Sequence, residues 1–274
     1  MRVYISADIE GIAGVVSRDN LMPGRFEYEA ARDWMTDAVL AACETVRELG
    51  AEEVVVSDSH GNGQNIRFER MPDYVQLVRS WPRPLGMMQG VEVGRYDGAL
   101  LLGYHAGASN PRGTLAHTLN GELIQELRLN GVIASEAAIS AAIAGHFGVP
   151  ILMLAGDDVA IEETRVLLGD IATTCLKTSI GWLSALNPPP AAADLALRAG
   201  VGDAIGRIGR LAPYVVPGPV TLDIRLRTRL VAEWLAYLGG IELLDAYTIR
   251  YRADDIVGVS HFLTFLTSAR SVLA

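Results

Sequence analysis

The sequence predicts an α/β fold, with a mainly parallel sheet sandwiched by helices and a smaller α+β unit towards the C-terminus. Short, continuously apolar runs such as Val54-Val55-Val56 have the composition of strands that are buried on both faces of a sheet. Longer segments with helical periodicity separate these runs. The 274 residues, 50% of them hydrophobic, suffice for one large core, or for one core with a smaller appendage.

The first part of the chain alternates strands and helices. Strands are expected at the apolar runs: residues 3–7, 53–57, 75–78, 98–103, 151–155 and 171–176. Helices are expected over the periodic segments: residues 26–49, 136–147 and 161–168. Asn130-Gly131 predicts a hairpin between residues 123–129 and 132–134, because this dipeptide favours the tight turn between two antiparallel strands. Ser135 is the expected N-cap of the Ala-rich helix that follows.

Pro188-Pro189-Pro190 is the one linker-like stretch, and we expect it to separate two domains. Residues 1–185 are predicted to form the α/β domain, which binds metal, and residues 186–274 the smaller α+β domain. The elements predicted after the prolines are a helical segment to residue 211, a strand at 220–226, a short helix near 234, a strand at 246–252 and a final helix at 254–272.

Composition excludes several classes of function. The net charge of −9, from 23 basic and 32 acidic residues, and the lack of a Lys/Arg cluster argue against nucleic-acid binding. Cys43 and Cys175 lie far apart in apolar contexts, which predicts reduced core thiols and no disulfide. The sequence shows no targeting segment before the first strand and no apolar run long enough to span a bilayer. These observations predict a cytoplasmic protein with no membrane partner.

Polar residues follow several of the predicted strands. Asp8 and Glu10 come after the first strand, Asp58 and His60 after the second, and His105 after a later one. Ligands of open parallel sheets bind at the carboxyl ends of strands, and an i, i+2 spacing keeps two side chains on one side of an extended segment. Imidazole and carboxylate ligands together suit zinc, and also manganese or cobalt. The alternative is that these residues cap loops, or that one of Asp58 and His60 supports the other.

Six short motifs follow one another along the chain. They are Ser6-Ala7-Asp8-Ile9-Glu10-Gly11-Ile12-Ala13-Gly14, Ser57-Asp58-Ser59-His60, Gly103-Tyr104-His105-Ala106, Ala116-His117-Thr118, Glu136 and Ala155-Gly156-Asp157-Asp158. In this order and with these separations they resemble the signature segments of the zinc-dependent D-aminopeptidase family, the DppA-like metallopeptidases. The resemblance runs from residue 1 to about residue 178 and continues more faintly to the C-terminus. No single motif is specific, but the combination is.

The resemblance implies an aminopeptidase or amidase that hydrolyses the N-terminal residue of short peptides or aminoacyl amides, with a D-amino acid as that residue. It implies two zinc ions with Asp8 as a bridge, and the ligands that carry over are Asp8, Glu10, His60, His105 and Glu136. It also implies a ring-like homo-oligomer and a catalytic role for His117, which we expect to be acid–base or oxyanion-stabilising. From the residues alone, Glu136 is also typical of a first-turn glutamate and His117 of a strand residue.

One departure from the family pattern surrounds Glu136. The family commonly has Gly before this Glu and Asn four residues after it, where this chain has Ser135 and Ser140. This departure does not change the predicted metal ligands. It leaves open which group orients the substrate, and therefore which substrate is preferred. The remaining candidates are expected in structural or supporting roles: His146, His261, Asp157 and Asp158.

Two other functions fit the same ligand set. Two divalent metals held by Asp, Glu and His also serve phosphoesterases, but the basic residues near the ligand motifs are only Arg18 and Arg112, which makes a phosphate clamp unsupported. The second alternative is a non-catalytic protein that uses its metal site for assembly. The peptidase remains the leading hypothesis because two metals can bind the substrate and stabilise a tetrahedral oxyanion.

Overall fold

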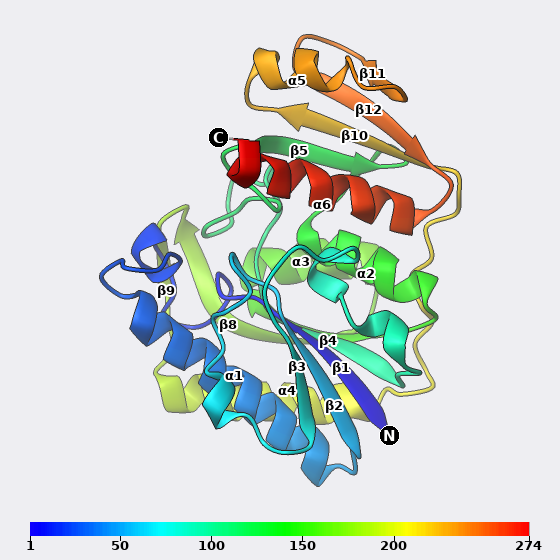
Figure 1. Ribbon diagram of the computed structural model, residues 1–274. Coiled ribbons are helices and arrows are strands. Elements are labelled where there is room, and N and C mark those ends of the chain that lie inside the picture. Colours follow the sequence, from blue (N-terminus) through cyan, green and yellow to red (C-terminus); the bar gives the residue numbers. More distant parts are fainter. Residues whose placement is uncertain (274) are drawn as a thin grey trace.

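The computed structural model describes residues 1–273, with side chains for residues 1–269, and has the predicted α/β fold (Figure 1). The strands of the larger sheet are Arg2–Ala7 (β1), Glu53–Asp58 (β2), Val75–Val78 (β3), Gly98–Tyr104 (β4), Ile151–Asp157 (β7), Ala172–Gly181 (β8) and Ser184–Leu186 (β9). Their spatial order is β3-β2-β1-β4-β7-β8-β9. All neighbours pair in parallel except β8 and β9, which pair antiparallel.

Helices cover both faces of this sheet. They are Tyr28–Glu48 (α1), Glu136–His146 (α2), Asp158–Leu168 (α3) and Pro190–Ile205 (α4). Val3 and Ile5 of β1 point to the face that α1 and α4 cover, whereas Tyr4 belongs to the core on the opposite face, with α2 and α3. The alternation follows from the two-residue period of a strand, and it explains why the central strands are apolar throughout.

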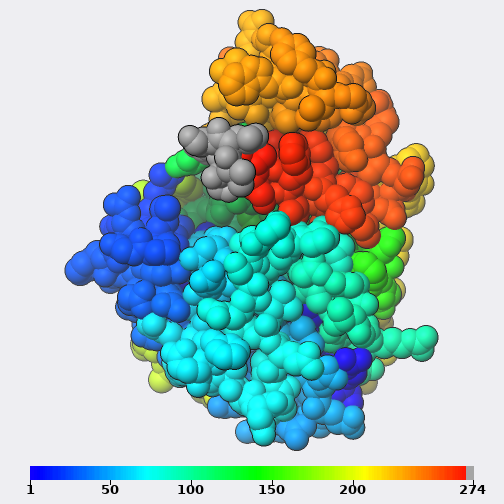
Figure 2. All heavy atoms as spheres, in the orientation of Figure 1, coloured from blue at the N-terminus to red at the C-terminus, as the bar shows by residue number. Residues whose placement is uncertain are grey.

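A second sheet lies at one end of the molecule (Figures 1 and 2). Its strands are Ile124–Leu129 (β5), Val132–Ile133 (β6), Val220–Leu226 (β10), Ile241–Leu243 (β11) and Thr248–Ala253 (β12). They pair antiparallel in the order β11-β12-β10-β5-β6. Helix Arg229–Leu235 (α5) packs on this sheet, and helix Ile256–Leu273 (α6) packs between the sheet and α2. Asn130 (φ 48°) and Gly131 (φ 83°) form the predicted turn of the β5–β6 hairpin.

Segments on either side of the three prolines join different sheets from those that the sequence predicted. The three prolines do not form a linker: Pro189 is the N-cap residue of α4 and Pro190 its first residue, a position that suits proline because its ring presets the helical φ. Helix α4 then packs on α1 and β8 of the larger sheet, while β5 and β6, from the first part of the chain, join the second sheet. The division into domains at residues 1–185 and 186–274 stays a prediction.

Other differences are local. Strands β9 and β11 have three residues each and were not predicted, because such short segments carry no periodic signal. Helix α3 begins at Asp158, three residues before its predicted start, because the Asp157 side chain caps it by accepting the N–H groups of Val159 and Ala160, both at 2.9 Å. Among the described residues, no helix has both the length and the apolar character needed to cross a membrane.

Candidate metal centre

The predicted ligands lie together at the carboxyl edge of the larger sheet. Asp8 and Glu10 follow β1, His60 follows β2, and His105 follows β4, which pairs with β1. Glu136 is the first residue of α2, whose N-terminus points to the same edge. The five residues are between 1% and 8% exposed. Parallel strands that end side by side therefore bring together residues separated by up to 128 positions.

Two glycines allow the loops at this edge to touch. A Cβ on Gly11 would lie 2.1 Å from the carbonyl oxygen of Tyr104, and one on Gly103 would lie 2.1 Å from the carbonyl oxygen of Asp8. Gly103 also has a φ of +70°, which disfavours other residues. The backbones that carry Asp8 and His105 are thus in direct contact, which a side chain at either glycine would prevent.

Each histidine in the centre uses one ring nitrogen to bind a main-chain carbonyl. His60 donates from Nε2 to Leu21 at 2.9 Å, and His105 donates from Nδ1 to Ala106 at 3.0 Å. A carbonyl oxygen only accepts, so these contacts fix which nitrogen carries the proton. The other nitrogen of each ring faces the acidic residues: Nδ1 of His60 lies 3.0 Å from Glu10 Oε2, and Nε2 of His105 lies 3.5 Å from Asp8 Oδ2 and from Glu136 Oε1. Metal-binding histidines are held in this way.

The possible ligand atoms form three groups: Glu10, His105 and His117 make up one, and the remaining two share Asp8. In the first of these two, atoms of Asp8, Glu10 and His60 lie within 4.8 Å of one another, and in the second, atoms of Asp8, His105 and Glu136 do. Among the described side chains, Asp8 Oδ2 and His105 Nε2 are buried and have no hydrogen-bond partner. Buried polar atoms without partners are costly, and a cation between them removes that cost. The residues therefore fit divalent metal, although their role as ligands stays a prediction.

The electrostatics also favour positive charge in this centre. Burial, together with repulsion from Glu10, raises the pKa of Asp8 well above its usual value. Burial alone would lower the pKa values of His60 and His105, but the attraction of Glu10 and Glu136 outweighs it and raises both. Despite burial, the histidines lower the pKa values of Glu10 and Glu136, so these carboxylates stay charged and attract positive charge, which a divalent cation can supply in place of protons on the rings.

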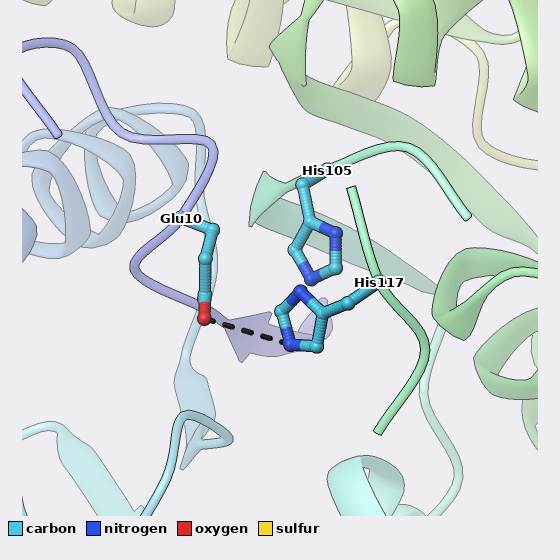
Figure 3. A group of neighbouring side chains, drawn as sticks. All are labelled: Glu10, His105 and His117. Carbon is cyan, nitrogen blue, oxygen red and sulfur yellow. Dashed lines mark ion pairs between the residues drawn. The ribbon is translucent and has the colours of Figure 1, made fainter. Parts of the chain in front are cut away.

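His117 lies against the ligands, on the loop after β4 (Figure 3). Its ring stacks on His105 with a centroid separation of 4.2 Å and an angle of 6°. Its Nδ1–H donates to the carbonyl of Leu115 at 2.8 Å, and its Nε2 lies 3.7 Å from Glu10 Oε1 and 3.8 Å from Glu136 Oε1. Burial and the nearby His105 lower the pKa of His117, so the ring favours its neutral form. His117 is thus close enough to the ligands to act in the same chemistry.

Lys177 is a member of the site that the sequence did not indicate. It lies on β8 with 1% exposure, and its ammonium group donates to the main-chain carbonyls of Glu10 and Val15, which holds the loop between them. Burial lowers its pKa to about 8, even though Asp157 and Glu10 attract the charge. A lysine in a strand of alternating burial is normally exposed, so no sequence signal marks this one.

The other candidates have structural contacts. Asp58 accepts hydrogen bonds from the main chain of Asn65 and Ile66 at 2.6 and 2.8 Å, and so supports the loop after His60. Ser140 is buried and its hydroxyl lies 3.0 Å from that of Tyr104. Exposed surface positions hold the remaining histidines, His146 and His261. The arginines considered for a phosphate clamp form exposed ion pairs, Arg18 with Glu122 and Arg112 with Glu162.

Known proteins resemble this chain along nearly its whole length. The family model Peptidase_M55, described as D-aminopeptidase, matches residues 1–265. The D-aminopeptidase of Bacillus subtilis (strain 168) is 29% identical over 268 residues, which is 97% of each chain. The solved structure of the Zn-dependent D-aminopeptidase DppA from Bacillus subtilis, described as a self-compartmentalizing protease, has a TM-score of 0.94 at 27% identity, and the match covers 100% of this chain and 99% of that one.

Proposed function

This chain belongs to the D-aminopeptidase family, and we propose that it is a two-zinc aminopeptidase or amidase that removes an N-terminal D-amino acid from short peptides. Its place in the family makes it a peptide hydrolase. The proposal concerns what family membership leaves open: the number of metal ions, the role of each site residue, and the substrate.

The observation that carries the two-zinc proposal is the position of Asp8 in two of the three groups of ligand atoms. Asp8, Glu10 and His60 would hold one zinc ion, and Asp8, His105 and Glu136 the other. The unpartnered atoms of Asp8 and His105 support this assignment, and so does the zinc dependence of the similar structure. Bound zinc supplies Lewis acidity, which polarises a carbonyl and lowers the pKa of water. Manganese or cobalt would suit the same ligands.

We propose that His117 is the acid–base residue. Peptide hydrolysis needs a proton on the leaving nitrogen, and a histidine near its neutral form can take up and deliver one. Nδ1 of His117 is committed to Leu115, so Nε2 is the atom that exchanges the proton. The His117 side chain is 22% exposed, against 1% for His105, so its ring faces the side from which a substrate can enter. Oxyanion stabilisation by the protonated ring is compatible with the same position.

Two further properties belong to the proposal. The similar structure is a self-compartmentalizing protease, which supports a homo-oligomer of this chain. A cytoplasmic location rests on the sequence alone, and no contact with nucleic acid or membrane enters the proposed function.

The metal proposal is tested on protein purified without added metal. We expect two zinc ions per chain by elemental analysis, and loss of turnover on chelation that added zinc reverses. Of the two groups that share Asp8, Glu10 belongs only to the first and Glu136 only to the second, so Glu10→Gln and Glu136→Gln should each reduce the content to about one ion. A single zinc ion in the unmodified protein would contradict the two-zinc site.

Substrate specificity is tested with a panel of aminoacyl amides and dipeptides that differ only in the hand of the first residue. We expect turnover of the D-forms and little of the L-forms. Uniform preference for L-residues would remove the D-specific part and leave the aminopeptidase. Faster hydrolysis of p-nitrophenyl phosphate than of every amide would contradict the peptidase function and support a phosphoesterase.

A further inference from the structure

The loop that carries His117 has a strained backbone on both sides of the histidine. Leu115 has a φ of 55° and Leu119 a φ of 58°. This left-handed region is unfavourable for residues other than glycine, and for a bulky residue such as leucine it persists only where the surroundings hold it. Two such residues, each two positions from His117, therefore require specific contacts that keep the loop in place.

The far side of the loop is held by the metal centre. The main-chain N–H of Leu119 donates to Glu136 Oε1 at 2.6 Å, so this strained residue is tied to a predicted ligand. Among the described residues, no predicted ligand makes such a hydrogen bond to the near side, so its restraint must come from another part of the structure.

The β8–β9 hairpin holds the near side through Thr114. This residue is fully buried, and its hydroxyl lies 3.1 Å from the carbonyl oxygens of both Gly181 and Ser184. Its main-chain N–H donates to the hydroxyl of Ser179 at 3.1 Å. Thr114 thus connects the loop to both strands of the hairpin immediately before the first strained leucine.

Trp182, at the tip of the same hairpin, provides two more contacts. Its carbonyl oxygen accepts the N–H of Leu115 at 2.8 Å, and its indole N–H donates to the carbonyl of Ala116 at 3.3 Å. The carbonyl of Leu115 in turn accepts the Nδ1–H of His117 at 2.8 Å. A continuous path of hydrogen bonds therefore runs from the hairpin through Leu115 to the ring of His117.

We propose that the β8–β9 hairpin is a positioning element for His117, and that Thr114 and Trp182 are its positioning residues. They hold Leu115 in its strained conformation, which fixes the tautomer of His117 and directs Nε2 towards Glu10 and Glu136. The consequence for turnover rests on the proposed acid–base role, whereas the consequence for the ring itself does not. The two are therefore measured separately.

The first measurement follows the His117 ring by NMR in protein labelled with 15N-histidine. The chain has five histidines, and the spectrum of His117→Gln identifies the signal. We expect a single Nδ1–H tautomer in the unmodified protein, and a mixture or a broadened signal in Thr114→Val, which keeps the shape but loses the hydroxyl. Thr114→Ser restores the hydroxyl and should restore the single tautomer. An unchanged His117 signal in Thr114→Val would overturn the proposal.

The second measurement is turnover. Displacing a catalytic group by about 1 Å costs up to 10²-fold, so we expect kcat of Thr114→Val to fall by roughly 10–10²-fold, with KM and zinc content nearly unchanged. Trp182→Phe, which keeps an aromatic ring but loses the indole N–H, should give a smaller fall in kcat, while Leu183→Ala, at the exposed tip, serves as a control with normal kcat. In a His117→Ala background, Thr114→Val should cause no further loss. An equal loss in both backgrounds, or loss of zinc, would contradict positioning through His117.

If His117→Ala keeps full turnover, the acid–base role fails, and the NMR signal of Thr114→Val still decides whether the hairpin positions the ring. If Thr114→Val does not fold, Trp182→Phe provides the same test, because Trp182 is half exposed and the variant keeps an aromatic ring there. An unchanged ring signal in that variant, together with normal kcat, would overturn the proposal as well.

Discussion

His117 differs from His60 and His105 in its electrostatic balance. All three rings donate to a main-chain carbonyl and direct the other nitrogen towards carboxylates. The carboxylates lie within 3.5 Å of His60 and His105 and raise their pKa values, whereas they lie farther from His117, where burial lowers the pKa. The carboxylates beside the first two rings thus favour positive charge, which a metal ion can supply in place of a ring proton, whereas the third ring is suited to exchange a proton.

The roles proposed for His117 predict different behaviour of His117→Ala. As an acid–base residue, it should lower turnover by roughly 10²–10⁴-fold while zinc content and melting temperature stay nearly unchanged. If His117 is a metal ligand, the variant should lose zinc. If His117 is structural, the melting temperature of the variant should fall. Elemental analysis, melting and turnover of the same preparation distinguish these cases, and normal turnover would exclude the catalytic role.

The two cysteines predict a second residue-scale result. Cys43 is fully buried on α1, and burial raises its pKa to about 12, so the reactive thiolate is scarce at pH 8. Cys175 is exposed. A thiol reagent at pH 8 should therefore modify about one thiol per native chain and two per unfolded chain. Cys175→Ser should abolish the native reaction, and rapid labelling of that variant would contradict the buried position of Cys43.

The sequence alone indicated some residues of the candidate site but not others. Asp8, Glu10, His60 and His105 follow strands, and parallel strands end at one edge, so their convergence could be predicted from pattern. Glu136 opens a helix, where a glutamate is common, and was assigned only through the family resemblance. Lys177 lies across the sheet from its partners, and nothing in its local sequence reports that distant contact.

Among the elements, α4 shows how packing decides which sheet a segment joins. Its apolar residues Leu197 and Val201 are buried against the larger sheet, although the helix follows the proline stretch that marked a domain boundary in the sequence. Gly200 lies at this contact, where a Cβ would be 2.0 Å from Thr174 Oγ1 and 2.8 Å from Met153 Cε. For Gly202, half a turn further on, no atom of the described residues lies within 4 Å of that position, apart from its chain neighbours and the backbone of its own helix.

These two glycines form a matched pair for a stability test. Gly202→Ala should raise the free energy of unfolding by about 0.5–1 kcal/mol, because alanine loses less entropy than glycine in a helix. Gly200→Ala has the same propensity gain but forces α4 away from β7 and β8, so it should be destabilising by about 1–3 kcal/mol. Urea unfolding of both variants measures the difference. Equal stabilisation would show that α4 does not pack closely on the larger sheet.

Most elements could be predicted because each carries a local signal. The apolar runs gave the central strands, the Asn130-Gly131 turn gave the β5–β6 hairpin, and Ser135 gave the start of α2. Local signals do not indicate which strands pair with each other. Strand β5 pairs with β10, which lies about 90 residues later, and Leu127 is opposite Ile224 in this pairing. Such pairings depend on the packing of the whole chain, so local patterns do not determine them.

At the scale of the whole molecule, the second sheet presents an apolar surface at the end remote from the larger sheet. On α5, Ala232 and Leu235 are buried against this sheet, while other apolar side chains of α5 and the turn after it are exposed. We call these the α5 patch: Leu230 (54% exposed), Trp234 (60%), Tyr237 (74%) and Leu238 (46%). Exposed apolar patches on a protein surface mark interaction sites, and the proposed homo-oligomer supplies a second copy as the partner.

The last prediction concerns this assembly. If the α5 patch forms a contact between copies, Trp234→Glu should weaken it, because removal of a central aromatic residue costs on the order of 2 kcal/mol or more, which is about 30-fold in affinity. Light scattering should show an oligomer for the unmodified chain and a smaller species for Trp234→Glu, with unchanged circular dichroism. Val166→Glu is the control, since Val166 is 90% exposed on α3, away from the patch. A monomer in the unmodified protein would contradict the homo-oligomer. An intact oligomer in Trp234→Glu, or equal dissociation in both variants, would instead assign the contact to another surface.

Turnover of the dissociated variant then shows whether the assembly is needed for catalysis. The candidate ligands all come from one chain, so we expect the separated copies to keep their zinc and to hydrolyse small aminoacyl amides at a rate similar to that of the oligomer.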